Sequence, residues 1–191
     1  ATKFTFPGRK HKYSDFEWNW THFDGIDYDD KSKEKAIFKF KDKNWSGAVD
    51  EEFGNYDYLM GADIDFANPE VVEECLNWGK WYIEFTQIDG FRLDAVKHIN
   101  ANFYKNWITT LRKEEEKELF TVGEYWSGDV SKLHRYLTEV EGQISLFDVP
   151  LHYNFSVASK DGIYDLTKIF ARTLVKENSS KAVTFVDNHD T

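Results

Sequence analysis

From about residue 80 onward, short apolar runs alternate with longer stretches whose hydrophobic residues recur with helical periodicity. This alternation is typical of βα units that build a mostly parallel sheet. The apolar runs predict strands over residues 88–94, 119–124, 144–149 and 182–187. The stretches between them predict helices over 102–117, 131–140 and 166–175, and Pro69 with Glu70 predicts an earlier helix that runs towards Phe85.

The spacing of these strands predicts an α/β fold that is part of a (β/α)8 barrel. Strand starts at residues 88, 119, 144 and 182 lie 25 to 38 residues apart, and a barrel of about 250 residues allots roughly 31 to each unit. A doubly wound open sheet would give a similar spacing. We prefer the barrel because the unusual polar residues follow several different strands. Four strands cannot close a barrel, so we expect the chain to be a fragment of something longer or half of an assembly.

Residues 1–68 have a different pattern, rich in aromatic residues, Asp and Gly, with only short strand-like pieces such as 36–40. We interpret this part as a separate irregular lobe that is inserted before the helix at Pro69, and residues 69–191 as the barrel. The chain contains no repeat, heptad or low-complexity tract.

Charge and aromatic content narrow the choice of partner. The chain has 34 acidic and 24 basic residues and a net charge of -10, which argues against nucleic acid or an anionic membrane as the main partner. No apolar run approaches the roughly 20 residues of a membrane span. Seven Trp, ten Tyr and 16 Phe exceed the usual needs of a core, and flat amphipathic rings suit the apolar faces of sugars. A neutral ligand fits best.

Cys75 is the only cysteine, so no internal disulfide can form. This slightly favours a cytoplasmic over a secreted protein. The chain begins at Ala1 and has no signal segment, so we expect upstream sequence, and neither targeting nor oligomeric state can be read.

The first candidate motif is DGFRLDAVKH at residues 89–98. Alternation along a strand places Arg92 and Asp94 on one face, where the guanidinium can hold the Asp94 carboxylate ionised. An ionised carboxylate is what a nucleophile needs. A structural ion pair at a strand end is the alternative.

The second motif is FTVGEYW at residues 120–126, a strand whose last residue, Glu124, is followed by two large rings. Apolar cover raises a carboxyl pKa, so Glu124 can remain protonated and act as a proton donor. Retaining glycosidases hold two such carboxyl groups about 5 to 5.5 Å apart, which adjacent barrel strands can provide. Taken alone, a glutamate in such a position is more often a solvated acid at a strand end.

The third motif, VTFVDNHD at 183–190, ends an apolar strand in four polar residues. These can bind a metal or grip sugar hydroxyls, and a polar loop is the alternative. The fourth is NYDYLMGADID at 55–65, with three carboxylates within nine positions. Hard oxygen ligands at this spacing suit Ca²⁺ better than Zn²⁺, although the regular twelve-residue calcium loop is absent and a solvated acidic loop stays open.

Taken together, these motifs resemble the α-amylase family of glycoside hydrolases, in particular the bacterial liquefying amylases and their cytoplasmic relatives. Further matching strings follow in order along nearly the whole chain: FPGR at 6–9, YSDF at 13–16, GNYDYLM at 54–60 and FDVPL at 147–151. The resemblance implies barrel strands four to seven with an inserted calcium-binding, β-rich B domain. It also implies retaining endo-hydrolysis of α-1,4-glucosidic bonds in starch, glycogen or maltooligosaccharides.

The resemblance also implies roles for individual residues. Asp94 is similar to the family's nucleophile, Glu124 to its general acid/base and Asp190 to its transition-state stabiliser. Arg92 matches the residue that positions the nucleophile. The positions that match sugar contacts are Lys97, His98, Trp126, His189 and Tyr56. The positions that match metal ligands are Asp24, Asp57, Asp63, Asp65 and a carbonyl of His98.

The chain departs from the secreted liquefying enzymes at Ser46 and Ala67, where their metal cluster has aspartates. We therefore expect a single Ca²⁺ ion. Because the first barrel strands and the eighth are absent, a non-catalytic glucan-binding fragment remains an alternative. A transglycosylase or an α-1,6-acting relative is the nearest competitor among enzymes.

Overall fold

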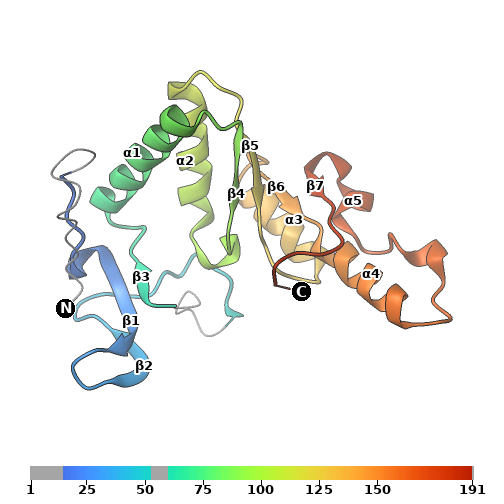
Figure 1. Ribbon diagram of the computed structural model, residues 1–191, viewed down its shortest axis with the longest axis horizontal. Coiled ribbons are helices and arrows are strands. Elements are labelled where there is room, and N and C mark those ends of the chain that lie inside the picture. The colour runs from blue at the N-terminus through green and yellow to red at the C-terminus, as the bar shows by residue number, and fades with distance from the viewer. Residues whose placement is uncertain (1–14, 53–59, 191) are drawn as a thin grey trace. The chain divides into compact units, whose positions relative to one another are not determined.

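The computed structural model describes residues 15–52 and 60–190, and the chain divides into two compact units. Unit 1 comprises residues 1–84 and 98–100, and unit 2 comprises residues 85–97 and 101–191. Figure 1 gives the order of the helices and strands along the chain.

Unit 1 is built on an antiparallel sheet with the strand order β2-β1-β3 (Figure 1). Its strands are β1 (Phe23–Asp29), β2 (Glu34–Lys39) and β3 (Ala62–Ile64), and the short helix η2 (Trp20–His22) precedes β1. Asn19 caps η2 through its side chain, which accepts the N–H of Thr21. The strand-like piece predicted at 36–40 corresponds to β2, while β1 and β3 were not predicted because Asp and Gly interrupt their apolar pattern.

Helix α1 (Pro69–Thr86) follows this sheet and confirms the helix predicted from Pro69. The side chain of Asn68 accepts the N–H of Glu70 at 2.9 Å, which satisfies one of the free donors of the first turn. The helix buries one face through Val71 and Ile83. Among the described residues, no helix is both long and apolar enough to cross a bilayer.

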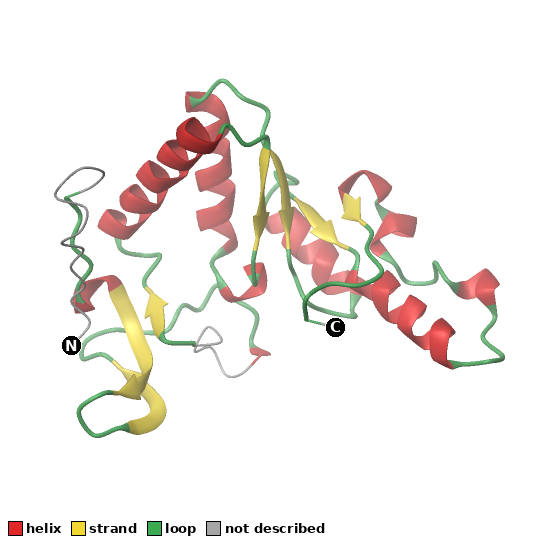
Figure 2. Cartoon of the chain, in the orientation of Figure 1, coloured by secondary structure: helices red, strands yellow, loops and turns green. Residues whose placement is uncertain are grey.

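Unit 2 contains a parallel sheet, whose strands are among those drawn in yellow in Figure 2. Its strand order, β4-β5-β6-β7, follows the sequence. The strands are β4 (Gly90–Leu93), β5 (Phe120–Gly123), β6 (Ser145–Phe147) and β7 (Ala182–Val183). Each strand pairs with the next along the chain, as in a barrel, and the described strands show no reversal of order of the kind that marks a doubly wound sheet. β4 and β5 approach so closely that a Cβ on Gly90 would lie 1.9 Å from the carbonyl oxygen of Phe120.

Helices connect these strands as the βα pattern requires. They are η4 (Val96–His98), α2 (Ala101–Glu114), α3 (Val130–Glu139), α4 (Val149–Lys160), η5 (Leu166–Lys168), α5 (Leu174–Glu177) and η6 (Ser179–Lys181). In α2 and α3, apolar residues spaced three or four apart form one face of the helix, and this face packs against the core. Ile108 and Leu111 of α2 and Leu133 of α3 are fully buried, as is Leu146 of β6.

The predicted helix over 166–175 is wrong, because that stretch holds only η5 and the first residues of α5. The principal helix after β6 is α4, whose start falls inside the strand predicted over 144–149. The buried carboxylate of Asp148 accepts the N–H of Leu151, and Pro150 lies in the first turn, so a helix begins where the apolar run suggested a continuing strand.

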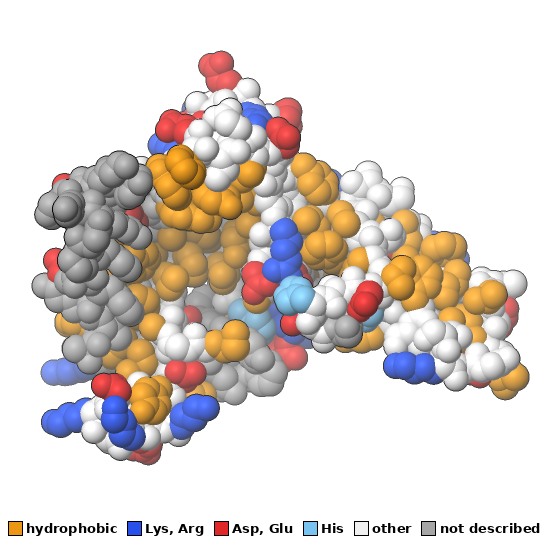
Figure 3. Space-filling view, in the orientation of Figure 1, with side chains coloured by type: hydrophobic (Ala, Val, Ile, Leu, Met, Phe, Trp, Pro, Cys, Tyr) orange, Lys and Arg blue, Asp and Glu red, His pale blue; other side chains and the backbone are white. Residues whose placement is uncertain are grey.

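The apolar residues that suggested a helix over 166–175 lie in part on the surface. Leu166 and Phe170 are 69% and 49% exposed, and Figure 3 shows hydrophobic side chains gathered over α4 and the turns that follow it. The strands predicted at 88–94, 119–124 and 182–187 are present but shorter. The residues at the carboxyl end of each predicted strand lie outside the paired register with the neighbouring strand.

Candidate active site

Asp94 and Glu124 leave the sheet side by side at the carboxyl ends of β4 and β5. The parallel register pairs Leu93 with Gly123, so the next residue of each strand emerges at the same edge. The N–H of Glu124 donates to the carbonyl of Leu93 at 2.8 Å, and the N–H of Val96 donates to the carbonyl of Glu124 at 3.0 Å. These backbone bonds fix the two carboxyl groups as neighbours.

The guanidinium of Arg92 lies between these two carboxylates. Its Nη1 donates to Oδ1 of Asp94, and its Nη2 lies 3.1 Å from Oε1 of Glu124. The two acids differ in exposure, since the side chain of Asp94 is 68% exposed and that of Glu124 only 9%. One cation therefore contacts one open and one buried carboxylate.

The turn at Ala95 supplies a further donor to the buried acid. Ala95 has φ 45°, a left-handed conformation that costs a non-glycine residue about 1–2 kcal/mol. In this conformation its N–H donates to Oε2 of Glu124 at 3.2 Å. Strained backbone at a site is a reason to examine the site for function, and here the strain directs a donor at the carboxyl group.

Burial raises the pKa of Glu124 above its ordinary value, and the negative charge of Asp94 and a hydrogen bond with it raise the pKa further. The Ala95 N–H and the charge of Arg92 act in the opposite direction without cancelling the rise. For Arg92, burial alone would lower the pKa, but the hydrogen bond to Asp94 and the charges of Glu124, Asp94 and Asp190 outweigh it and raise the pKa. The surroundings therefore favour the protonated form of Glu124 and the charged form of Arg92 beside it.

Asp190 lies within electrostatic reach of this group, because its charge contributes to the raised pKa of Arg92. Its N–H donates to the side chain of Asn188 at 2.9 Å, and its carboxylate lies 3.2 Å from Nε2 of His189. His189 and Asp190 are both exposed at the end of the segment after β7. The structure therefore brings acids from three strand ends of one sheet into the same region.

Lys97 and Trp126 also belong to this edge of the sheet. Nζ of Lys97 donates to the carbonyl of Trp126 at 2.9 Å, which ties the turn after β4 to the loop after β5. The ring of Trp126 contacts those of His152 and Phe185 at centroid distances of 5.8 and 6.1 Å. Of the other sugar-contact candidates, His98 belongs to unit 1, and Tyr56 lies outside the described residues.

Sequence reasoning missed Ala95 and His152. Nothing in the sequence of a single alanine indicates a positive φ. His152 follows an apolar stretch after Asp148 that the sequence suggested to be a strand. Its buried position on the first turn of α4 could be predicted only if that helix were recognised.

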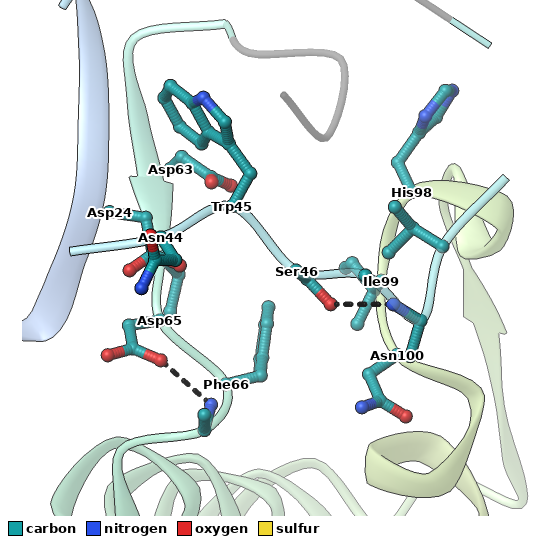
Figure 4. Close-up of a pocket in the computed structure, with 15 residues that line it drawn as sticks. Asp24, Asn44, Trp45, Ser46, Asp63, Asp65, Phe66, His98, Ile99 and Asn100 are labelled. Carbon is teal, nitrogen blue, oxygen red and sulfur yellow. Dashed lines mark hydrogen bonds between the residues drawn. The ribbon is translucent and has the colours of Figure 1, made fainter. Parts of the chain in front are cut away.

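A pocket of about 340 Å³ lies in unit 1 and collects most of the candidate metal ligands. Asp24, Asp63, Asp65 and His98 all line it (Figure 4), whereas Asp57 lies outside the described residues. Asp24 is 5% exposed, and Oδ2 of Asp63 is buried. Asp65 contacts the ammonium of Lys43, whose Nζ also donates to the carbonyl of Thr21 at 2.7 Å.

The donors of this pocket are of the right kind for Ca²⁺, because carboxylate oxygens are hard ligands. Ser46 and Ala67 line the same pocket without adding a carboxylate. Within residues 15–52 and 60–190, no three His, Cys, Asp or Glu side chains converge closely enough to hold a metal ion. A complete ligand set would therefore need carbonyl oxygens or residues beyond the described part.

A parallel sheet whose strands follow the sequence order, with acids gathered at its carboxyl edge, is the arrangement of a βα-barrel enzyme. Residues 6–191 match the family described as the alpha-amylase catalytic domain, and the chain belongs to this family. The sheet is accordingly part of a (β/α)8 barrel, which confirms the fold predicted from the strand spacing.

Curated relatives match the chain over its whole length. The chain is 54% identical over 193 residues to an alpha-amylase of Geobacillus stearothermophilus and 50% identical over 195 residues to a cytoplasmic alpha-amylase of Escherichia coli (strain K12). It covers 35% and 39% of their lengths. Among solved structures, the alpha-amylase of Geobacillus thermoleovorans in complex with acarbose is 28% identical with a TM-score of 0.59, and the match covers 69% of this chain and 30% of that one.

Proposed function

We propose that the protein to which this chain belongs is a retaining glycoside hydrolase that cleaves internal α-1,4-glucosidic bonds in starch, glycogen or maltooligosaccharides. The observation that carries this proposal is the pair of neighbouring carboxyl groups in opposite environments. Asp94 is exposed and ion-paired, while Glu124 is buried with a raised pKa. A retaining glycosidase needs this division between a nucleophile and a proton donor.

In the proposed reaction, an oxygen of Asp94 attacks the anomeric carbon and forms a covalent glycosyl ester. The bond to the leaving sugar breaks as Glu124 gives its proton to the departing oxygen. Glu124, now ionised, takes a proton from water, whose oxygen displaces Asp94 from the anomeric carbon. Two inversions give net retention, and Glu124 regains its proton.

Arg92 orients the carboxylate of Asp94 before the attack through the hydrogen bond between them. Asp190 is proposed to stabilise the positive charge that develops on the sugar ring. Lys97, Trp126 and His189 are proposed to contact sugar hydroxyls and ring faces at this edge of the sheet. His98 and Tyr56 are assigned the same role by family position only.

For the metal, we propose one Ca²⁺ in the pocket of unit 1, with Asp63, Asp24 and the carbonyl of His98 as ligands together with Asp57. Asp65 is the weakest member of the proposed set, because its carboxylate already contacts Lys43. The ion would cross-link distant segments of the chain and would supply no step of the hydrolysis.

The proposal is tested by incubating the whole protein with maltooligosaccharides and following the products by proton NMR. Release of shorter α-1,4-glucans that first appear as α-anomers is expected for a retaining endo-hydrolase. Products that first appear as β-anomers would contradict the mechanism. Products longer than the substrate would identify a transglycosylase, and cleavage of isomaltooligosaccharides instead would identify an α-1,6-acting enzyme.

A further inference from the structure

The segment between β7 and Asp190 has little regular structure to hold it. β7 ends at Val183, whose carbonyl accepts the N–H of Asp148 at 2.9 Å. Residues 184–190 belong to no helix or strand. This segment nevertheless carries Asp190, whose charge acts on Arg92, so its position relative to the strand ends matters for the site.

His152 on the first turn of α4 contacts this segment directly. The residue is 6% exposed, and Nδ1 of its ring lies 2.9 Å from the carbonyl oxygen of Val186. A carbonyl oxygen only accepts, so His152 must carry a hydrogen on Nδ1 and donate it. The accepting carbonyl belongs to Val186, four residues before Asp190, and the hydrogen bond is partly buried.

Ring contacts add to this hydrogen bond. The imidazole of His152 stacks on Phe185 with a centroid distance of 4.8 Å and an interplanar angle of 6°. It also contacts Trp126, in the loop after Glu124, at 5.8 Å. One side chain on α4 therefore joins the segments that follow β5 and β7.

His152 itself stands on a firmly held helix start. The carboxylate of Asp148 is fully buried and accepts three backbone N–H groups, from Leu151 at 3.1 Å, Leu174 at 3.1 Å and Val175 at 2.7 Å. These bonds join the first turns of α4 and α5, so the imidazole projects from a fixed point of the fold.

We propose that His152 is a positioning residue of the active site, which sets the place of Asp190 by donating a hydrogen bond to the carbonyl of Val186. The assignment of Asp190 as a participant in the reaction rests on the proposed hydrolase function. His152 contacts neither Asp94 nor Glu124 in this role; it acts through the backbone of the segment that carries His189 and Asp190.

Two substitutions separate the hydrogen bond from the ring contacts. His152→Phe keeps a ring that can stack on Phe185 but removes the donor. His152→Asn loses the ring but places an amide N–H at the position that corresponds to Nδ1. His134→Phe is the matched control, because His134 lies on α3 with its Nε2 2.9 Å from Glu177 on the exposed surface.

In the whole protein, His152→Phe is expected to lower kcat roughly 10- to 100-fold with little change in KM, the size of effect seen when a reacting group is displaced slightly. His152→Asn should recover a large part of this loss, and His134→Phe should retain wild-type kcat. If His152 only stabilised the fold, His152→Phe would lower the melting temperature but leave kcat unchanged below it, which would overturn the proposal.

Hydrogen exchange of the peptide that contains residues 184–190 gives a readout that needs no activity. His152→Phe should speed exchange there while α3 remains as protected as in the wild type. Unchanged exchange in this peptide would overturn the proposal even if kcat fell. If the wild type cleaves no α-glucan, the proposed function fails, and the exchange result still decides whether His152 holds the segment.

Should the His152→Phe protein fail to fold, His152→Asn decides. Wild-type exchange at 184–190 together with substantial kcat would support the hydrogen bond as the element that matters. A low kcat together with wild-type hydrogen exchange at residues 184–190 would contradict the proposal.

Discussion

Two groups of acidic residues in this chain have similar composition but different surroundings. At the ends of β4 and β5, Arg92 contacts both Asp94 and Glu124, and the two carboxyl groups differ sharply in exposure. In the pocket of unit 1, Asp24, Asp63 and Asp65 line one cavity, with Lys43 at Asp65. The first arrangement places two carboxyl groups in different surroundings, which suits acid/base chemistry. The second places several carboxylate oxygens around one cavity, which suits a cation.

The largest effect is expected from Asp94→Asn, which should lower kcat at least about 10³-fold because an amide cannot form the glycosyl ester. The side chain is 68% exposed, so the loss of its ion pair should change stability by no more than about 1 kcal/mol. Steady-state kinetics and thermal unfolding measure both quantities. Asp89→Asn, next to the other end of β4 and 95% exposed, is the control; near-normal turnover by Asp94→Asn would refute the nucleophile assignment.

Glu124→Gln should reduce kcat on natural glucans by roughly 10²- to 10⁴-fold, since the amide has no proton to give to the leaving oxygen. Glycosides with good leaving groups need no such proton, so glycosylation on them should be largely restored. Rates on activated and natural substrates provide the comparison, and Glu141→Gln, an exposed acid paired with Lys105, is the matched control. An equal loss on both substrate types would count against the acid/base role.

Removal of metal probes the second group of acids. An ion that binds only the folded state stabilises it by about 2.7 kcal/mol at a hundredfold excess over Kd, so a chelator should lower the melting temperature of the whole protein. Asp63→Asn should abolish the chelator effect, and Asp89→Asn should leave it intact. No bound calcium by metal analysis and no chelator effect would show that these aspartates form a solvated or salt-bridged cluster.

The smallest effect is a pH dependence. Because the pKa of Glu124 is raised by burial, the proton donor stays available above the ordinary glutamate pKa of about 4.3. kcat/KM should then fall about tenfold per pH unit once the pH rises above the pKa of Glu124. The protonated carboxyl contributes stability that is present at low pH and is lost as the pH rises through the folded-state pKa. If kcat/KM does not fall at high pH, or if the fall is unchanged in Glu124→Gln, the assignment of Glu124 as the proton donor is contradicted.

The comparison also shows what the sequence can and cannot predict. The alternation of apolar runs and helical stretches predicted the parallel sheet, and the residues that follow β4 and β5 became the candidate site, because strand ends are local features. The helix α4 was missed since its start depends on Asp148, whose carboxylate also binds α5, 26 and 27 residues further along the chain. Contacts between such distant residues leave no local pattern.

The metal pocket and the turn at Ala95 show the same limit. The spacing of Asp63 and Asp65 suggested that both bind the same metal ion. In the structure, however, the carboxylate of Asp65 contacts the ammonium of Lys43, 22 residues away in the chain. The positive φ of Ala95 follows from where β4 ends relative to Glu124. Residue type and spacing predicted which side chains could bind a metal or transfer a proton. Tertiary contacts decided which of these side chains meet at each site.

The central claim is that Asp94 is the nucleophile and Glu124 the proton donor. The most direct measurement is to trap the covalent intermediate in the Glu124→Gln variant of the whole protein with a fluorinated maltosyl fluoride, a substrate with a good leaving group. Peptide mass spectrometry then locates the label. We predict a glycosyl ester on Asp94, and a label on any other carboxylate, such as Asp190, would contradict the account.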